Sequence, residues 1–164
     1  MPDKVIITFV GDVDGDGCDE IIYGSCAIDH NGKGLYTTKM GHGDAIHLTH
    51  FDPSRKGLQV WDCHENKRDG STYRDAATGE ILFQIKDSTD VGRCMAADID
   101  PTSGREMWSL ASGGIRNIKG EVVKARVRGL SCNMAVWWDG DLLRELLDRN
   151  IVSNIIGRKE SVSV

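Results

Sequence analysis

The first place where side chains are spaced for chemistry is a short acidic loop near the start of the chain. Asp12, Asp14 and Asp16 alternate with small residues, Gly17 follows at the bend, and Glu20 is ninth from the first aspartate. This spacing is typical of a loop that wraps oxygen ligands around a hard cation, and Ca²⁺ accepts such ligands in relaxed geometry. The alternative is a solvated acidic turn. We favour calcium, in a loop that differs from an EF-hand because an apolar, strand-like run follows at once.

The acidic pattern returns three more times, each time ahead of an apolar run. Asp98 and Glu106 repeat the first and ninth positions, whereas His50 and Gln59 replace them in a degraded copy, where we expect ion binding to be weakened or lost. A fourth, shorter variant begins at Asp139. The copies start about 38, 48 and 41 residues apart, and such periods are typical of propeller blades. The expected calcium ligands are Asp12, Asp14, Asp16, Cys18, Glu20, Asp98, Asp100, Glu106, Asp139, Asp141 and Glu145.

A second group of polar residues surrounds two histidines in the first half of the chain. Glycines flank His42, which lets an imidazole stand in an open pocket or approach an ion, and His64 and Glu65 follow later. We favour a calcium site in which Asp44 and Glu65 are ligands beside an unusual histidine, or a loop that contacts polysaccharide. Zinc held by His42, His47 and His64 is an alternative on paper, and ordinary turn residues are another.

Two tryptophans, Trp137 and Trp138, precede the fourth acidic stretch. An aromatic face suits the apolar side of a sugar ring, so both are candidate substrate contacts. A tryptophan at the end of a strand is more often part of the core, and this is the interpretation that we favour.

The rest of the chain predicts an all-β fold. β-branched residues dominate, and 19 glycines are available for tight turns. Each unit is expected to contain an acidic loop, an inner strand, a polar turn and an outer strand. In the first unit these are a strand over 21–27, a turn over 29–34 and a strand over 35–39. One short helix is expected over 141–148. With 164 residues the chain holds three to four units, fewer than most closed propellers need.

Composition limits the partners. The net charge is −5, from 25 acidic and 20 basic residues, and no basic stripe with interleaved aromatics indicates nucleic-acid binding. No apolar stretch is long enough to span a membrane, and residues 1–10 do not resemble a signal peptide. The five cysteines form neither a CxxC pair nor a disulfide framework, which favours buried thiols.

Six stretches carry a resemblance to a known family. They are 11–17, 41–47, 64–67, 74–79, 95–101 and 135–148. Calcium loops alone fit many propellers, but Gly-His-Gly-Asp, His-Glu-Asn-Lys and Trp-Trp-Asp-Gly-Asp-Leu in this order are specific. The run from Gly11 to Arg149 resembles the middle of the catalytic propeller of rhamnogalacturonan lyases, polysaccharide lyase family eleven.

The resemblance implies a segment of an eight-bladed β-propeller that holds several calcium ions and cleaves the rhamnose–galacturonate backbone of rhamnogalacturonan I, in pectin, by β-elimination. That reaction needs a cation on the uronate carboxylate and a base for the C5 proton. The bases that the chain offers are His42, His64, Lys67 and Arg93, and a histidine deprotonates most easily near neutral pH. The implied partners are pectic polysaccharide and the remaining blades, and the implied location is extracellular or periplasmic.

The resulting domain assignment is a propeller segment over 1–149 and a divergent tail over 150–164, which we interpret as a truncation or frame change. Two other hypotheses stay open. One is a non-catalytic, calcium-stabilised propeller module that binds carbohydrate or protein, and the other is a truncated product without activity.

Overall fold

The computed structural model describes residues 7–111, 113–125, 130–154 and 161–163, and these form strands and turns without a helix. The strands make four sheets. The first contains β1 (Thr8–Gly11), β2 (Glu20–Tyr23), β3 (Cys26–Ile28) and β4 (Gly34–Thr37). The second contains β5 (Ile46–Thr49), β6 (Gln59–Cys63), β7 (Ser71–Asp75) and β8 (Ile81–Ile85). The third contains β9 (Cys94–Ala97), β10 (Glu106–Ser109), β11 (Ile115–Arg116) and β12 (Val122–Lys124). The fourth contains β13 (Met134–Val136), β14 (Glu145–Asp148), β15 (Ile151–Ser153) and β16 (Ser161–Ser163).

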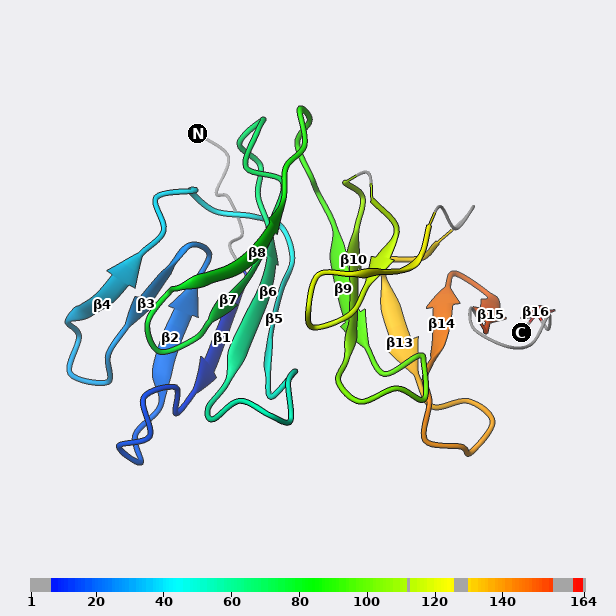
Figure 1. Ribbon diagram of the computed structural model, residues 1–164, viewed down its shortest axis with the longest axis horizontal. Helices are drawn as coiled ribbons and strands as arrows, with labels where there is room; N and C mark the ends of the chain where they lie inside the picture. The colour runs from blue at the N-terminus through cyan, green and yellow to red at the C-terminus, as the bar shows by residue number, and fades with distance from the viewer. Residues whose placement is uncertain (1–6, 112, 126–129, 155–160, 164) are drawn as a thin grey trace.

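Each sheet is an antiparallel meander whose strands pair in chain order. The four sheets follow one another across the molecule from the first part of the chain to the last (Figure 1). The expected all-β class is confirmed. Each acidic loop joins the first strand of a sheet to the second. The expected unit began with the loop, whereas the observed unit begins with a strand that precedes it.

The first unit also differs within its expected strand. The strand predicted over 21–27 is divided at Gly24, which has a φ of 52° and turns the chain from β2 into β3. A positive φ is accessible to glycine at little cost. The expected hairpin is therefore three strands rather than two.

The helix expected over 141–148 is wrong, because β14 pairs with both β13 and β15. Leu142 is 90% exposed whereas Leu146 is fully buried, although a helix would place both on one face. Asp141 accepts the N–H of Leu143, a contact that a helix N-cap would also make, but the chain continues as the paired strand β14. Sheet pairing outweighs the weak helical spacing.

The hydrophobic core is distributed between consecutive sheets. The cluster between the first and second sheets contains Val13, Ile22, Ala27, Ile46, Val60 and Ala76. The cluster between the second and third contains Phe51, Trp61, Cys63, Tyr73, Ile85, Val91, Cys94, Met107 and Ala111. The cluster between the third and fourth contains Met95, Ala97, Ile99, Trp108, Ile115, Cys132 and Leu146. Each sheet thus depends on its neighbour for burial of its apolar face.

Two tryptophans in equivalent strands connect successive sheets. Trp61 of β6 donates its Nε1–H to the carbonyl of Trp108 in β10 at 3.1 Å, and Trp108 donates its own to the carbonyl of Ser131 at 2.8 Å. Both tryptophans are fully buried. A large ring whose N–H is satisfied across the interface fixes one sheet against the next.

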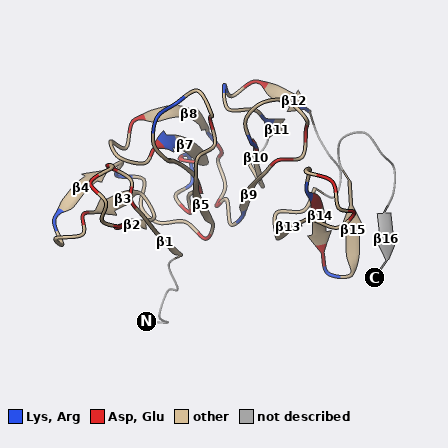
Figure 2. Ribbon diagram, turned by 90° about the horizontal axis from the view of Figure 1, so that it is seen from below, with Lys and Arg blue, Asp and Glu red and all other residues tan. Residues whose placement is uncertain are grey.

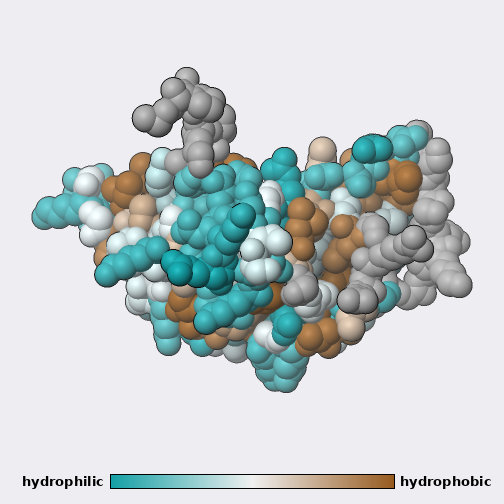
Figure 3. All heavy atoms as spheres, turned by 90° about the horizontal axis from the view of Figure 1, so that it is seen from above, coloured by the Kyte–Doolittle hydropathy of each residue, from teal (hydrophilic) through white to brown (hydrophobic). Residues whose placement is uncertain are grey.

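Basic and acidic residues are mixed along the chain. Lysine and arginine are dispersed along the described chain, and acidic residues recur in all sheets (Figure 2). At the end opposite the acidic loops, hydrophilic residues gather over the second sheet and apolar residues are visible towards the third and fourth (Figure 3). Within the described residues, no helix has the length and apolar character needed to cross a bilayer.

Candidate functional site

One buried side chain holds each of the four acidic loops. Glu20, Gln59, Glu106 and Glu145 are the first residues of β2, β6, β10 and β14, and at most 4% of each is exposed. Each side chain turns back into its loop and accepts a backbone N–H there. The ninth-position residue therefore begins a strand and closes the loop at once.

The first loop gathers carboxylate oxygens that could contribute to a site for a hard cation. Oxygens of Asp12, Asp14 and Glu20 lie within 4.8 Å of one another. Glu20 Oε2 accepts the N–H of Val13 at 2.9 Å, whereas Oε1 is buried and has no hydrogen-bond partner among the described residues. A buried carboxylate oxygen without a partner is costly, and a cation would satisfy it. The residues fit Ca²⁺.

The fourth loop repeats this arrangement. Asp139, Asp141 and Glu145 bring ligand oxygens within 4.8 Å of one another. Glu145 Oε2 accepts the N–H of Trp138 at 3.0 Å, and Oε1 is again buried without a hydrogen-bond partner in the described part of the chain. This loop also fits Ca²⁺.

The second loop closes without a cation. Gln59 Oε1 accepts the N–H groups of Phe51 and Asp52 at 2.9 and 3.1 Å, and its Nε2 donates to the carbonyl of Gly57 at 2.9 Å. The amide nitrogen thus occupies the place of the carboxylate oxygen that lacks a partner in the first and fourth loops. His50 contacts the carbonyl of Arg55 instead of the loop centre. This geometry supports the prediction that the degraded copy has lost its ion.

The third loop keeps the buried glutamate of the first and fourth loops but, among the described residues, does not gather three ligand atoms as they do. Glu106 Oε2 accepts the N–H groups of Ile99 and Asp100, and burial raises the pKa of its carboxyl to about 7. Asp98 lies 3.6 Å from Arg105. Of the three loops expected to bind calcium, the described residues form a group of three close ligand atoms in the first and fourth but not here.

His42, Asp44, His64 and Glu65 form a group that we call the histidine cluster. It lies at the opposite end of the sheets, where β4 connects to β5 and β6 to β7 (Figure 1). His42 Nε2 is 3.4 Å from Glu65 Oε2, and 26% and 27% of the two side chains are exposed. The backbone N–H of Glu65 donates to the carbonyl of His42, and Asn66 Nδ2 donates to the carbonyl of Met40. The two connections are therefore fixed to each other, and they place the imidazole beside the carboxylate.

The β4–β5 connection passes so close to the β6–β7 connection that only glycine fits at position 43. A Cβ at this position would lie 1.5 Å from the carbonyl oxygen of Cys63, a separation that only a backbone shift could relieve. The next residue, Asp44, has its carboxyl pKa raised by burial and then by the charges of Glu65 and Asp90. The charges of Asp44, Glu65 and Asp90 thus act on one another, and Glu65 is the carboxylate that contacts His42.

The other expected bases have different surroundings. His64 is fully buried, its Nε2 lies 3.0 Å from Thr72 Oγ1, and burial lowers its pKa. Lys67 and Arg93 are exposed. His47 contacts the carbonyl of Cys94. The described residues do not bring the three histidines of the zinc alternative into one group of ligand atoms.

The two tryptophans are exposed in the described chain, where the favoured interpretation had placed them in the core. Trp137 is 63% and Trp138 51% exposed, and the guanidinium of Arg144 lies 3.8 Å from the centre of the Trp137 ring. Trp138 donates its backbone N–H to the loop glutamate, as Val13 and Ile99 do in their loops. Those two residues are buried against the following sheet, and Trp138 is the equivalent residue of the last described sheet.

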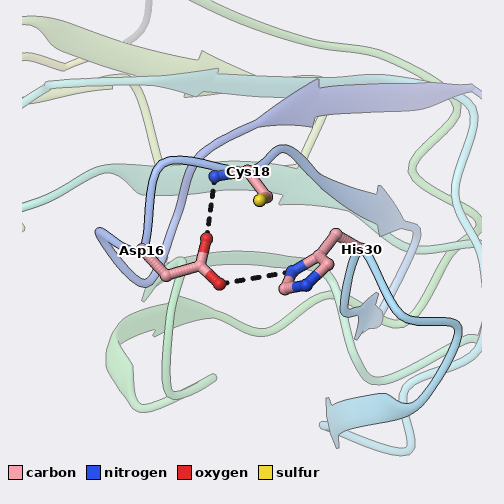
Figure 4. A group of neighbouring side chains, drawn as sticks. All are labelled: Asp16, Cys18 and His30. Carbon is pink, nitrogen blue, oxygen red and sulfur yellow. Dashed lines mark hydrogen bonds and ion pairs between the residues drawn. The ribbon is translucent and has the colours of Figure 1, made fainter.

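His30 is a residue near the first loop that the sequence patterns missed. It enters from the turn after β3, and its Nδ1 lies 2.8 Å from Asp29 Oδ1 and 3.3 Å from Asp16 Oδ2. Figure 4 shows the Asp16 carboxylate between the backbone N–H of Cys18 and the imidazole. The loop spacing carries no signal for His30, because the histidine belongs to a later turn.

A cavity of about 730 Å³ lies along the first strands of the sheets. Its lining includes Phe9 of β1, His47 of β5, Met95 of β9 and Met134 of β13, together with the charged residues Asp44 and Arg93. Part of the histidine cluster therefore borders a concave surface shared by all four sheets.

These features define a class of protein. It is an all-β repeat protein with acidic loops at one end of its sheets and a histidine–carboxylate cluster at the other. The family model for the C-terminal domain of rhamnogalacturonan lyase family 11 matches residues 6–163, and the chain belongs to this family. The resemblance noted from the motifs is thereby confirmed.

Relatives agree with this assignment. Rhamnogalacturonan endolyase YesW and exolyase YesX of Bacillus subtilis (strain 168) are 54% identical over 144 residues and 52% identical over 151 residues. Each alignment covers 86% of this chain and 23% or 24% of the relative. The crystal structure of rhamnogalacturonan lyase YesW and the structure of Bacillus licheniformis rhamnogalacturonan lyase PL11 both match with a TM-score of 0.82 and 51% identity, over 88% of this chain and 25% of theirs. The chain spans about a quarter of the length of these relatives.

Proposed function

We propose that the chain is the part of a rhamnogalacturonan lyase that supplies the catalytic base, and that the enzyme cleaves the rhamnose–galacturonate backbone of rhamnogalacturonan I by β-elimination. The observation that carries this proposal is the pairing of His42 with Glu65 on an accessible end of a chain that is 54% identical to an enzyme named rhamnogalacturonan endolyase. The family relationship gives the reaction class, and the geometry selects the residue.

His42 is suited to remove the C5 proton of a galacturonate unit. Its side chain is partly exposed, so a polymer can approach the ring, and Glu65 lies 3.4 Å from its Nε2. Because Nδ1 is buried, Nε2 is the nitrogen that would take the proton. A carboxylate at that distance orients the ring and stabilises the imidazolium that forms when the proton is taken. His64 is a weaker candidate because it is fully buried. We assign it to holding the β6–β7 connection through Thr72.

Asp44 and Glu65 are the residues that would hold a Ca²⁺ ion at the reaction centre. Burial, and then neighbouring carboxylates, raise the pKa of Asp44 although Arg93 opposes the shift, as expected where several acidic groups crowd together. When bound, the ion supplies positive charge that neutralises the uronate carboxylate and makes the C5 proton more acidic. Exposed Arg93 and Lys67 are suited to contact uronate carboxylates on neighbouring sugar units.

We infer that Ca²⁺ also occupies the first and fourth loops in a structural role. Support comes from the buried Oε1 atoms of Glu20 and Glu145, which lack hydrogen-bond partners in the described chain. Ligands fixed at the start of β2 and β14 would connect each ion to strand pairing. The second loop is excluded from this group by the contacts of Gln59.

We propose that the four sheets are blades of a β-propeller and that further blades of the enzyme pack against both ends of this array. Val10, Ile21 and Tyr23 expose apolar surface on the first sheet, and Trp138 occupies a position that is buried by the following sheet in the equivalent loops. Exposed apolar surface of this kind is typical of an interface. Because the proposed substrate is a cell-wall polymer, the proposed location is extracellular or periplasmic.

The test uses a chimera in which residues 7–154 replace the matching segment of YesW. Cleavage of rhamnogalacturonan I is followed by the absorbance of the unsaturated uronate, with calcium and then with chelator. We expect a calcium-dependent rise that falls by about 100-fold or more in His42→Gln. The thermal unfolding midpoint should be unchanged. His50→Gln, which changes an exposed histidine at the other end of the sheets, is the matched control.

Two outcomes contradict the proposal in different ways. A folded chimera with intact His42 that forms no unsaturated product would refute the lyase function of this segment. A His42→Gln chimera that keeps the parental rate would leave the function intact and refute the choice of base.

A second candidate function is polysaccharide binding without cleavage. It is favoured by the exposed rings of Trp137 and Trp138, because sugar rings stack on accessible aromatic faces. Binding of rhamnogalacturonan I by the chain, with loss of affinity in Trp137→Ala but no product, would support it. No measurable binding would oppose it.

A further inference from the structure

We propose that Arg74, paired with Asp62, is a positioning residue for His42, because it fixes the β4–β5 connection by joining the first sheet to the second. Arg74 is in β7, and its side chain is fully buried. Its Nη1 donates to Asp62 Oδ2 of β6 at 3.0 Å, and its Nη2 donates to the carbonyl of Gly24 in the β2–β3 turn. The kinetic part of this proposal rests on the proposed function, since it takes His42 as the catalytic base.

On the side of the first sheet, the partner of Arg74 lies against His42 itself. A Cβ at Gly24 would lie 3.1 Å from the Cα of His42 and 3.3 Å from the carbonyl oxygen of Gly41. The next residue of the turn, Ser25, donates its N–H to the same carbonyl at 3.2 Å. The position of the turn therefore sets the position of the His42 backbone, and Arg74 fixes the turn.

On the side of the second sheet, Asp62 lies against the residue that follows His42. A Cβ at Gly43 would lie 3.3 Å from Asp62 Oδ1, and this oxygen is buried without a hydrogen-bond partner among the described residues. His64 Nδ1 is 3.9 Å from the other oxygen, Oδ2. Burial raises the pKa of Asp62, and the charge of Arg74 opposes this shift more strongly than that of His64. Arg74 is thus the main counter-charge that holds the carboxylate against the connection.

The third sheet indicates that the repeat does not need this pair in order to fold. Arg116 of β11 is the equivalent of Arg74, because each pairs with the second residue of the preceding strand. The fourth residue of β6 is Asp62, whereas the fourth residue of β10 is Ser109. Arg116 Nη1 donates to the carbonyl of Gly120 within its own sheet. The arginine–aspartate pair therefore belongs to the sheet that carries part of the histidine cluster, which favours a role at that cluster.

The variant that tests this role removes both charges. Loss of one member of a buried ion pair leaves the other uncompensated and destabilises the fold, whereas exchange of the whole pair for uncharged groups of similar size is often neutral. Asp62→Asn combined with Arg74→Met keeps the volume and loses the contact with Gly24. Arg74→Lys is a second variant, which keeps a counter-charge for Asp62 but lacks the planar fork that holds two partners at once.

The kinetic test uses the YesW chimera with rhamnogalacturonan I. We expect kcat to fall by about 10–100-fold in the double variant while KM changes by less than about threefold, because displacement of a catalytic group costs rate more than binding. Arg74→Lys should lower kcat in the same direction. Trp61→Phe is the matched control, because it removes the hydrogen bond between the second and third sheets. It should lower the thermal unfolding midpoint and leave kcat unchanged.

Hydrogen exchange on the chain itself gives a measurement that does not depend on cleavage. The N–H groups of Ser25 and Glu65 donate to the carbonyls of Gly41 and His42, and both should exchange faster in the double variant and in Arg74→Lys. Exchange in β9 and β10 should be unchanged.

The outcomes separate this inference from the proposed function. A parental chimera that forms no product would refute the lyase function, and hydrogen exchange would still decide whether Arg74 fixes the connection. Unchanged exchange at both amides would overturn the positioning role. So would parental kcat in a folded double variant, or a loss of kcat in Trp61→Phe as large as that in the double variant.

Discussion

The second loop is closed by the Gln59 amide and needs no cation. Gln59→Glu should remove this contact and destabilise the loop. The side chain is fully buried, and its Nε2 donates to the carbonyl of Gly57 at 2.9 Å. A carboxylate in the same place would set an oxygen against that carbonyl, with no donor between them. The loop would then resemble the first and fourth loops without their ion.

The magnitude follows from the cost of keeping the new carboxyl protonated. A protonated acid can donate to Gly57 as the amide does, so the substitution is nearly neutral at low pH. Each pH unit above the ordinary glutamate pKa then costs about 1.4 kcal/mol. At neutral pH the free energy of unfolding should be lower by about 2–3.5 kcal/mol, because the N–H groups of Phe51 and Asp52 still stabilise part of the charge. The raised folded-state pKa means that stability is present at acid pH and lost as pH rises.

Urea unfolding in chelator at mildly acid and mildly alkaline pH measures this. The matched control is Gln84→Glu, because Gln84 Nε2 also donates to a backbone carbonyl, that of Asp69, from a half-buried side chain. We expect the control to lose about 1 kcal/mol or less. Equal unfolding free energies for Gln59→Glu and the parent chain at both pH values would refute the idea that the amide replaces a cation.

Three further predictions concern other parts of the structure. Gly43→Ala should lower the free energy of unfolding by about 3 kcal/mol, because its Cβ would overlap the carbonyl of Cys63. Gly34→Ala, whose Cβ would meet open space, is the control. Equal urea midpoints for the two variants would contradict the steric argument. Burial lowers the pKa of His47, so the folded chain keeps this histidine neutral. Stability is therefore lost as pH falls below about 6.5. His47→Gln should make the thermal unfolding midpoint less dependent on pH in this acid range. Chelation should speed amide hydrogen exchange in the first and fourth acidic loops while leaving 51–59 unchanged, and uniform exchange in all loops would oppose the assignment of ions.

The repeats and the fold class could be predicted because they depend on short-range chemistry. Carboxylate spacing, glycine at bends and alternating apolar residues are local, and they correctly indicated an all-β chain with three to four related units. The helix over 141–148 failed for the same reason, since its weak periodicity carried no information about the pairing of β14 with β13 and β15.

Burial and long-range contacts could not be obtained in this way. The exposure of Trp137 depends on what packs beside the fourth sheet, and the burial of His64 depends on strands on both sides of it. His30 approaches Asp16 only because the β3–β4 turn folds back on the first loop. Of the candidate bases, the sequence ranked His42 and His64 together, and fractional exposure separates them.

Calcium dependence of activity would not by itself identify the catalytic ion, because the acidic loops and the histidine cluster lie at opposite ends of the sheets. Chelation would loosen β2 and β14 at one end and remove charge near Asp44 at the other. Glu145→Gln separates the two effects, since an amide should close the fourth loop without an ion, as Gln59 does in the second. In the YesW chimera this variant should unfold at a temperature less sensitive to chelator, while cleavage still requires calcium. Cleavage that becomes independent of calcium would instead place the essential ion in the fourth loop and refute the assignment of Asp44 and Glu65.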